Sequence, residues 1–207
     1  MYQHQNKTMN LEEIKKHKPD NIHDVIESAF FTNYDVNDYV YCKNYYEWNY
    51  AIAKYLQPKT FLEIGVRLGF SFLPTLVGAE SIEYAEGWDI ESYVTNGNKM
   101  STDNISKYYN GLCKWSILNV NSQEVDVLPQ KFDFINIDGC HDYDCKKHDL
   151  KLAMDSCKYA LLDDYDYHFY VKEAIDDFIE QNKERIESYL YIPTFRGSML
   201  IKFKGNE

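Results

Sequence analysis

Acidic side chains stand at the ends of several apolar segments of this sequence. Glu63, Asp89 and Asp138 each close a short run of aromatic and aliphatic residues, and the pair Asp163–Asp164 closes another. In an open α/β sheet, ligands bind beyond the carboxyl ends of the parallel strands, which meet at one edge. We therefore expect these carboxylates to converge on one ligand site, where they would suit an amine or hydroxyl groups.

A pair of glycines marks the first of these segments. In the stretch "FLEIGVRLGF" (61–70), the acid Glu63 is followed by Gly65 and Gly69, which is typical of a buried strand that enters a tight turn and then a helix. A dinucleotide site would require Gly-x-Gly-x-x-Gly, and a phosphate-binding loop would require Gly-Lys-Ser/Thr. The stretch matches neither pattern, so it predicts a ligand without a pyrophosphate.

The three aspartates of the last two acidic segments have the chemistry of a metal site. Asp138, Asp163 and Asp164 offer the oxygen ligands that Mg²⁺ prefers. A divalent cation held there would lower the pKa of a substrate hydroxyl. The alternative is that Asp163 and Asp164 only cap the next element, while Asp138 only positions a cofactor.

His141 is the candidate general base. It follows Asp138 by three residues, and imidazole titrates near neutral pH, as proton removal from a hydroxyl requires. Two alternatives stay open from the sequence. Asp138 or Asp164 could be the base instead, or His141 could be a loop residue that bonds only to the backbone.

Other polar residues near these motifs receive no catalytic role from the sequence. Lys146 is expected to be solvated, and His148 is expected to be exposed or to cap a helix. His168 is expected in a loop over the site, without an assigned role. Cys140 lies near the acids, but a reactive thiol needs electropositive neighbours, so Cys140 is not expected to be a nucleophile.

The elements that would position these residues alternate between strand and helix. Strands are predicted at 60–64, 82–89, 113–120, 132–138, 159–164, 188–195 and 198–204. Helices are predicted at 10–18, 45–56, 71–79, 97–110, 145–158 and around 171–179. This order predicts a doubly wound, Rossmann-like α/β fold with a mostly parallel seven-stranded sheet, to which a C-terminal hairpin adds an antiparallel strand.

Composition limits the setting of the chain. Its 207 residues suit one domain, residues 44–207, preceded by a tyrosine-rich segment, residues 1–43, that we interpret as a cap or lid. A net charge of -11 argues against a nucleic-acid partner. The absence of a long apolar run argues against a membrane span. Five cysteines without a Cys-x-x-Cys pair, and no signal peptide, favour a reduced, cytoplasmic setting, and a homo-oligomer is possible.

Taken together, these motifs resemble a known family. "LEIGVRLGFS" resembles the first motif of class I S-adenosylmethionine-dependent methyltransferases, and Asp89 matches their acid after the second strand. "FINIDGCHDYDCKKHDLKLA" resembles the IDG-x-H-x-Y segment of small O-methyltransferases. "LLDDYDY" followed by "VKEAIDDF" resembles a segment of metal-dependent sugar O-methyltransferases of the macrocin and novobiocin type. The resemblance covers roughly residues 45–205.

The resemblance implies a role for each motif. The glycine turn would pass close to the methionine part of S-adenosylmethionine (SAM), Glu63 would favour its ammonium, and Asp89 would hold both ribose hydroxyls. Asn121 and Ser122 would face the adenine. The full set that the resemblance places at the cofactor is Glu63, Gly65, Arg67, Gly69, Ser71, Asp89, Asn121, Ser122 and Asp138. His141 and Asp138 would be catalytic, and Asp138, Asp163 and Asp164 would bind the metal.

The function expected from this resemblance is methyl transfer from SAM to a hydroxyl of a sugar or another small polar acceptor, assisted by Mg²⁺. The sequence departs from the family pattern at the fifth strand. The stretch "SCKYALLDD" lacks the Pro-Gly-Gly turn that is usual there, so the position of Asp163 along this strand is left open. The alternatives are a metal-dependent hydrolase that uses the Asp/His cluster and a methyltransferase-like protein that binds without catalysis.

Overall fold

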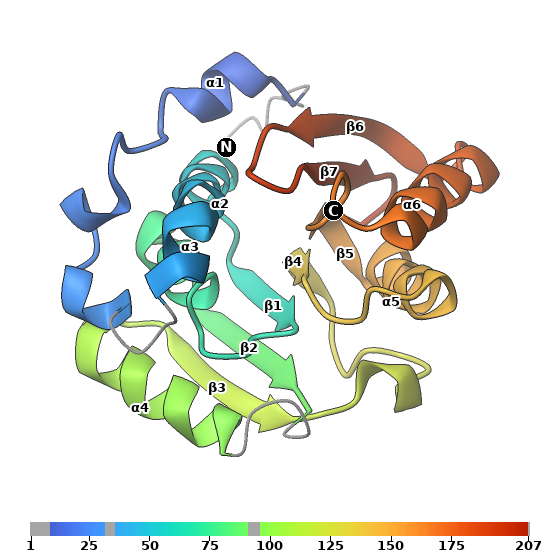
Figure 1. The fold of residues 1–207 in the computed structure, drawn as a ribbon. Coiled ribbons are helices and arrows are strands. Elements are labelled where there is room, and N and C mark those ends of the chain that lie inside the picture. Colours follow the sequence, from blue (N-terminus) through green and yellow to red (C-terminus); the bar gives the residue numbers. More distant parts are fainter. Residues whose placement is uncertain (1–8, 32–35, 91–95, 207) are drawn as a thin grey trace, which may run out of the picture.

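The computed structural model describes residues 9–31, 36–90 and 96–206, which fold around one central sheet (Figure 1). The strands are β1 (Thr60–Ile64), β2 (Tyr84–Asp89), β3 (Lys114–Asn119), β4 (Phe132–Ile137), β5 (Cys157–Leu162), β6 (Ile186–Ile192) and β7 (Ser198–Phe203). The α-helices are α1 (Leu11–Lys15), α2 (Val36–Leu56), α3 (Phe72–Gly78), α4 (Gly97–Tyr108), α5 (Tyr143–Ser156) and α6 (Phe169–Gln181). Short 3₁₀ helices are η1 (Ile22–Asp24), η2 (Ser28–Phe31) and η3 (Ser122–Glu124).

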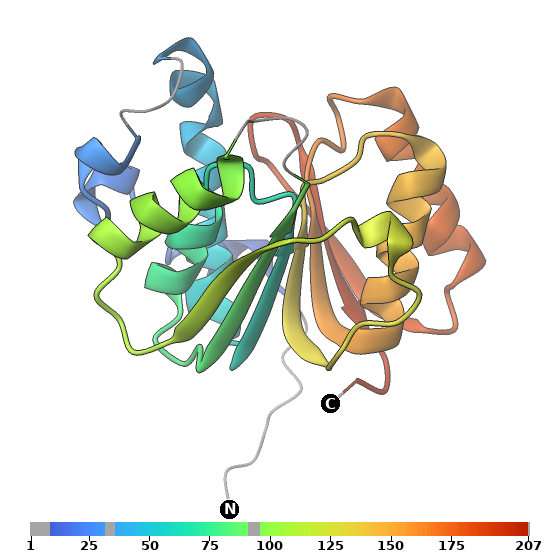
Figure 2. The same cartoon turned by 90° about the horizontal axis from the view of Figure 1, so that it is seen from below.

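The sheet is doubly wound, as the sequence predicts. Its strand order is β3-β2-β1-β4-β5-β7-β6, and β1 to β5 pair in parallel. Strand β7 lies between β5 and the edge strand β6 and pairs antiparallel with both. Figure 2 shows α2, α3 and α4 on one face of the sheet and α5 and α6 on the other. The predicted fold class, including the antiparallel C-terminal hairpin strand, is confirmed.

The central strands carry the core of the molecule. Phe61 on β1 and Phe134 on β4 are fully buried and stack with ring centroids 5.4 Å apart. Such strands are buried on both faces because helices cover both, so their sequences are nearly continuous apolar runs. Polar residues inside these runs are therefore exceptions, and two of them, Glu63 and Asn136, belong to the site described below.

The junction between α5 and β5 determines how far along the sheet Asp163 and Asp164 lie. The helix ends at Ser156 and the strand begins at Cys157, so no separate turn stands between them. Phe132 pairs with Cys157, and the register continues to the end of β4, where the backbone N–H of Asp163 donates to the carbonyl of Ile137 (3.3 Å). Asp163 therefore lies level with the end of β4 even without the Pro-Gly-Gly turn.

The N-terminal part of the chain packs into the same core. Ile14, Ile22 and Phe30 are fully buried and join the cluster formed by α2 and α3. Helix α2 begins well before the predicted start at residue 45 and crosses the predicted boundary between residues 43 and 44. Tyr45 and Tyr46 are buried in it, so these two tyrosines are core residues. A separate cap at residues 1–43 stays a prediction.

Within the described part of the chain, no helix combines the length and apolar character needed to cross a membrane.

Candidate active site

The glycine turn after β1 is tightly held against the end of β4. Gly65 has φ +94° and donates its backbone N–H to the carbonyl of Trp88 (2.8 Å). A Cβ added at Gly65 would lie 2.4 Å from the backbone oxygen of Asp138. Gly69, with φ +82°, faces Ile105 of α4, which a Cβ would approach to 2.8 Å. Only glycine fits both positions, so the turn brings the first motif into contact with the acid after β4.

Glu63 lies inside β1 rather than at its open end. Its side chain is fully buried, and both carboxylate oxygens accept hydrogen bonds, from Ser71 Oγ (2.6 Å) and from Asn136 Nδ2 (3.3 Å). Burial raises the pKa of Glu63 to about 8, and the negative charges of Asp89 and Asp163 act in the same direction. Glu63 is therefore largely protonated at neutral pH in this form of the protein.

Asn136 is a site residue that the sequence analysis missed. It faces Glu63 in the β1–β4 register and is fully buried. Its Nδ2 also lies within hydrogen-bonding distance of Tyr45 Oη (3.1 Å) and Asn49 Oδ1 (3.4 Å), both on α2. Asn136 thus ties the long N-terminal helix to the acids of the sheet. The signal for it was an asparagine within the otherwise apolar end of the run "FDFINID".

The raised pKa of Glu63 predicts a distinct pH dependence of stability. A carboxyl whose folded pKa exceeds its unfolded value of 4.5 stabilises the fold below pH 4.5, and this contribution is lost as the pH rises through about 8. We expect the Glu63→Gln variant to unfold with nearly wild-type free energy at pH 5. At pH 9 it should be the more stable protein, by several kcal/mol, since one pKa unit corresponds to about 1.4 kcal/mol.

Denaturant titrations of the ligand-free protein at several pH values would measure this difference. Asp133→Asn is the control variant. It also removes an acid from β4, but at the opposite end of the strand, where the Asp133 carboxylate accepts hydrogen bonds from the backbone N–H groups of Lys59 and Thr60. A difference between Glu63→Gln and wild type that did not change with pH would contradict the buried, protonated carboxyl.

Asp89 closes β2 beside the glycine turn. Its carboxylate accepts a hydrogen bond from the backbone N–H of Arg67, a residue with φ +51°. Burial raises the pKa of Asp89, and hydrogen bonds from the backbone N–H groups of Arg67 and Ile90 oppose that rise. The carboxylate therefore lies at the rim of the turn that also holds Gly65.

Asn121 and Ser122 follow β3 at the same edge. Asn121 caps η3, where its Oδ1 accepts from the N–H of Gln123 (3.2 Å). Ser122 hydrogen-bonds to Asp149 of α5. His148 Nε2 lies 3.0 Å from the carbonyl oxygen of Ser122, so His148 fixes this segment and is neither exposed nor a helix cap. The predicted contact of Asn121 and Ser122 with an adenine stays a prediction.

The three aspartates meet beyond β4 and β5. One carboxylate oxygen from each of Asp138, Asp163 and Asp164 lies within 4.8 Å of the others. Burial and the negative charges of Asp163 and Asp164 raise the pKa of Asp138 well above its ordinary value. Burial and the neighbouring Asp164 raise the pKa of Asp163 to about 7, although Ser198 Oγ donates to it (2.8 Å). Crowded oxygen donors of this kind fit a hard divalent cation.

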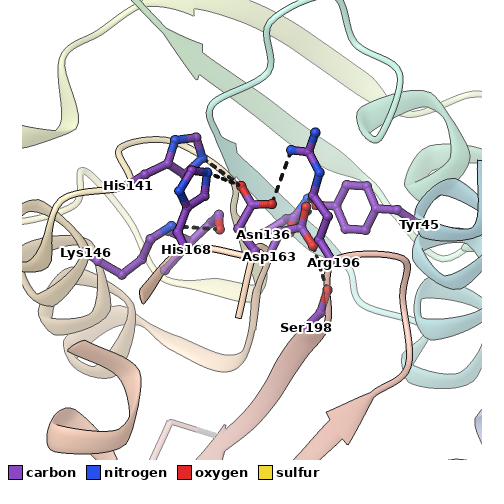
Figure 3. A network of polar contacts seen from close by, with 10 residues as sticks. Tyr45, Asn136, His141, Lys146, Asp163, His168, Arg196 and Ser198 are labelled. Carbon is purple, nitrogen blue, oxygen red and sulfur yellow. Dashed lines mark hydrogen bonds and ion pairs between the residues drawn. The ribbon is translucent and has the colours of Figure 1, made fainter. Parts of the chain in front are cut away.

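Asp164 has several ionisable neighbours, of which His141, His168 and Arg196 are labelled in Figure 3. It is buried, and its Oδ2 lies 2.8 Å from His141 Nε2 and 3.9 Å from His168 Nε2. Arg196 Nη1 lies 3.3 Å from its Oδ1. Burial acts to raise the pKa of Asp164, but the bond with His141 and the charge of Arg196 outweigh it, so the pKa is lowered. Asp164 therefore stays ionised.

The two histidines form a stacked pair. The rings of His141 and His168 are nearly parallel, at 17°, with centroids 4.4 Å apart (Figure 3). His168 is the residue just before α6. The short turn between Asp164 and this helix brings His168 back beside the site. The Nε2 atoms of both rings face Asp164 Oδ2, and ligand atoms of His141, Asp164 and His168 lie within 4.8 Å of one another. Stacking holds the His141 ring in place, and the spacing of the three groups is also compatible with a metal ion.

Lys146 corrects one expectation from the sequence. It is fully buried rather than solvated, and its Nζ donates to the carbonyl oxygen of Ile137 (3.5 Å). Its positive charge acts to lower the pKa of both Asp138 and Asp163. Lys146 and Arg196 thus place two cationic side chains around the three carboxylates, and neither was identified from the sequence.

The geometry thus forms two adjoining halves. The turn with Glu63 and Asp89 forms one half at β1 and β2, and the aspartates with His141 form the other at β4 and β5. The predicted residues Gly65, Arg67, Gly69 and Ser71 belong to the first half, and Asp138 joins the two. Their roles towards a cofactor remain predictions.

Solved structures with the same fold include several methyltransferases. The chain is 18% identical to an SAH-bound methyltransferase of Podospora anserina (TM-score 0.65, covering 96% of this chain and 91% of that one). It is 15% identical to an O-methyltransferase of Bacillus cereus solved with S-adenosylhomocysteine (SAH). The TM-score is 0.65, and the match covers 91% of this chain and 99% of that one. It is 13% identical to TomG, an O-methyltransferase of Streptomyces achromogenes involved in tomaymycin synthesis and solved with SAM (0.62; 95% and 92%).

The expected class I methyltransferase fold is thereby confirmed, and at these identities the likeness is one of fold. No protein-family model matches the sequence, and no curated protein matches it at a significant level.

Proposed function

We propose that this chain, which has the class I methyltransferase fold, transfers a methyl group from SAM to a hydroxyl of a small polar acceptor. The observation that carries the proposal is the contact between the two halves of the site. The turn beside Glu63 and Asp89 touches the backbone of Asp138, so a donor bound in the first half would end beside the acids of the second. Proximity of that kind is a large part of what catalysis of a group transfer requires.

The first half supplies groups suited to each end of SAM. Asp89 would accept hydrogen bonds from both ribose hydroxyls, which requires it to share or release the N–H of Arg67. Glu63 would lie under the ammonium of the methionine part, directly or through water. An ammonium favours the ionised form of a neighbouring carboxyl, so Glu63 would lose its proton when SAM binds.

The second half would hold Mg²⁺ and the acceptor. The carboxylates of Asp138, Asp163 and Asp164 are the residues that would bind the cation, which would lower the pKa of the acceptor hydroxyl. Lys146 already balances part of their charge from the buried side. Asp138 is the partly exposed member of the three, so the cation and the acceptor would approach from its side.

His141 would take the proton from the acceptor. Its Nε2 faces the ionised Asp164, so Nε2 carries the ring proton and Nδ1 keeps the free electron pair. Its side chain is 42% exposed, which leaves Nδ1 accessible to an acceptor. Asp164 would hold the ring in this tautomer and stabilise the imidazolium that forms, and His168 would keep it in place by stacking.

Aromatic side chains near this half support an acceptor with a flat or apolar face, such as a sugar. Tyr167, Phe169 and Tyr170 follow the acidic pair and are more than half exposed. Tyr167 meets His168 edge-on, with centroids 4.8 Å apart, and the Arg196 guanidinium lies 4.5 Å from the Tyr167 ring centroid. Carbohydrates and aromatic rings both pack on such surfaces, so the acceptor class stays open between them.

Calorimetric titration of SAM into the protein tests the proposal. We expect saturable binding with or without Mg²⁺, and no binding of NADH as a control ligand. Asp89→Ala should weaken SAM binding about tenfold to a hundredfold, because a charge-assisted hydrogen bond contributes roughly 1.5–3 kcal/mol. At pH 7 the binding enthalpy should depend on the ionisation enthalpy of the buffer, because Glu63 releases its proton, and this dependence should shrink in Glu63→Gln.

Absence of SAM binding by the folded protein would overturn the proposal. The Asp/His cluster would then have to be tested for metal-dependent hydrolysis. SAM binding without transfer to any sugar or phenolic acceptor would leave a binding protein.

A further inference from the structure

Two thiols and a carboxylate gather where the loop that follows Asp138 enters α5. The ligand atoms of Cys140, Asp142 and Cys145 all lie within 4.8 Å of one another. Cys140 Sγ lies 3.8 Å from Asp142 Oδ2. Both thiols are free and partly exposed, so a small ion can reach them from solvent. This cluster uses none of the groups assigned above to the cofactor, the acceptor or the oxygen-ligated cation.

The spacing of these atoms agrees with a tetrahedral cation that prefers sulfur. Zinc binds thiolate at about 2.3 Å and carboxylate at about 2.0 Å, which places a sulfur and an oxygen ligand about 3.5 Å apart. The observed 3.8 Å between Cys140 Sγ and Asp142 Oδ2 needs only a small closure. Two such sulfurs would be about 3.8 Å apart, within the observed limit of 4.8 Å.

The position of Asp142 provides an independent observation. It is the N-cap residue of α5, where an aspartate normally accepts a hydrogen bond from the N–H groups of the first turn. Its side chain makes no such capping bond. The carboxylate instead faces the Cys140 thiol, so the helix gives up a stabilising cap while the carboxylate stays available as a ligand.

We propose that Cys140, Asp142 and Cys145 form a second cation site, selective for a thiophilic divalent ion of the zinc class. Three protein ligands leave the fourth tetrahedral position open to water. The oxygen-only cluster of Asp138, Asp163 and Asp164 selects hard ions such as Mg²⁺, so ligand softness separates the two sites. Both thiols give up their protons on binding, and these protons are released to solvent.

The place of this site in the chain connects it with the proposed catalytic centre. His141 stands between two of the ligands, on the loop from β4 to α5. An ion held by Cys140, Asp142 and Cys145 would fix both sides of His141. Both cysteines bind as thiolates, so proton release opposes ion binding and the site should empty as the pH falls.

A titration with Cd²⁺ tests the proposal, because thiolate ligation of cadmium produces an ultraviolet charge-transfer band that oxygen ligation does not. The full chain, kept reduced with a phosphine, is titrated without SAM and with excess Mg²⁺ to fill oxygen sites. We expect the band to saturate at a single equivalent and Zn²⁺ to abolish it by competition. The measurement does not depend on methyl transfer, so its failure is distinct from failure of the proposed function.

Matched variants assign the ligands. Cys140→Ser and Cys145→Ser should each weaken Cd²⁺ binding by at least about tenfold, because even groups that only support metal ligands change affinity by 10–100-fold. Asp142→Asn should weaken binding while the band remains. Cys42→Ser, which removes a partly exposed thiol of α2, should bind as wild type does.

Absence of the band, or a band unchanged in Cys140→Ser, would overturn the proposal. Cys140 lies in a loop, so its variant is expected to fold, and this can be checked by circular dichroism. The Cys140→Ser result is therefore decisive even if Cys145→Ser, within α5, proves unstable.

Discussion

Asp164→Asn should lower the rate of methyl transfer by a hundredfold or more while SAM still binds with nearly wild-type affinity. Loss of a positioned general base typically costs about 10²–10⁴ in rate. Asparagine tolerates the left-handed backbone of Asp164, φ +63°, so the substitution changes charge more than fold. The amide cannot hold His141 in the tautomer that frees Nδ1, and it leaves Arg196 without its anionic partner.

The measurement compares formation of S-adenosylhomocysteine by wild type and variant, using an acceptor that wild type methylates. Asp155→Asn removes an acid that pairs with Arg185 at the far end of α5, and it should be as active as wild type. Transfer by Asp164→Asn at the wild-type rate would show that Asp164 and His141 do not lie at the reacting centre. Loss of SAM binding instead would show that the acid cluster supports the donor rather than the acceptor.

Gly65→Ala should destabilise the fold and abolish measurable SAM binding. A side chain in the left-handed region costs of order 1–3 kcal/mol, and here its Cβ would also overlap the Asp138 backbone oxygen at 2.4 Å. The backbone must move, so the turn and the end of β4 would both leave their positions. We expect the free energy of unfolding to fall by about 2 kcal/mol or more, measured by denaturant titration.

Gly205→Ala separates the cost of the backbone conformation from the cost of the overlap with Asp138. Gly205 also has a positive φ, +78°, but a Cβ there would meet nothing within 4 Å. Its variant should lose only the backbone part of the cost, towards the lower end of about 1–3 kcal/mol, and so less stability than Gly65→Ala. If both variants lost the same stability, the close approach of the turn to Asp138 would not matter for the fold.

The alternation of strands and helices could be predicted from the sequence because it depends on local patterns. The apolar run that contains Phe134 is short and rich in aromatic and β-branched residues, which is typical of a buried strand, and Leu150, Ala153 and Met154 recur at helical spacing. The acids that end these strands must then meet at one edge of a parallel sheet. Element boundaries depend on more than the local pattern: α2 starts at Val36, nine residues before the predicted start.

The cations around those acids could not be predicted, because their positions depend on contacts distant in sequence. Lys146 lies in a polar stretch that suggests a solvated helix face, and only the packing of α5 against the sheet turns it inward. Arg196 reaches Asp164 because β7 inserts between β5 and β6, which brings the turn before Ser198 beside the end of β5. The order of the strands in the sheet depends on tertiary contacts and cannot be read from the local sequence.

The sequence by itself therefore determined which acidic groups reach the ligand edge, since the strand pattern is local and the alternation of strands with helices implies a parallel sheet. Only the tertiary structure decided their ionisation and partners. Glu63 is protonated because the surrounding core excludes water from it, and this outweighs the hydrogen bonds from Ser71 and Asn136, which favour the ionised form. Asp164 is ionised because His141 and Arg196 arrive from other segments of the chain. Burial and charge pairing are properties of the assembled fold, and they set the pKa values on which the proposed chemistry depends.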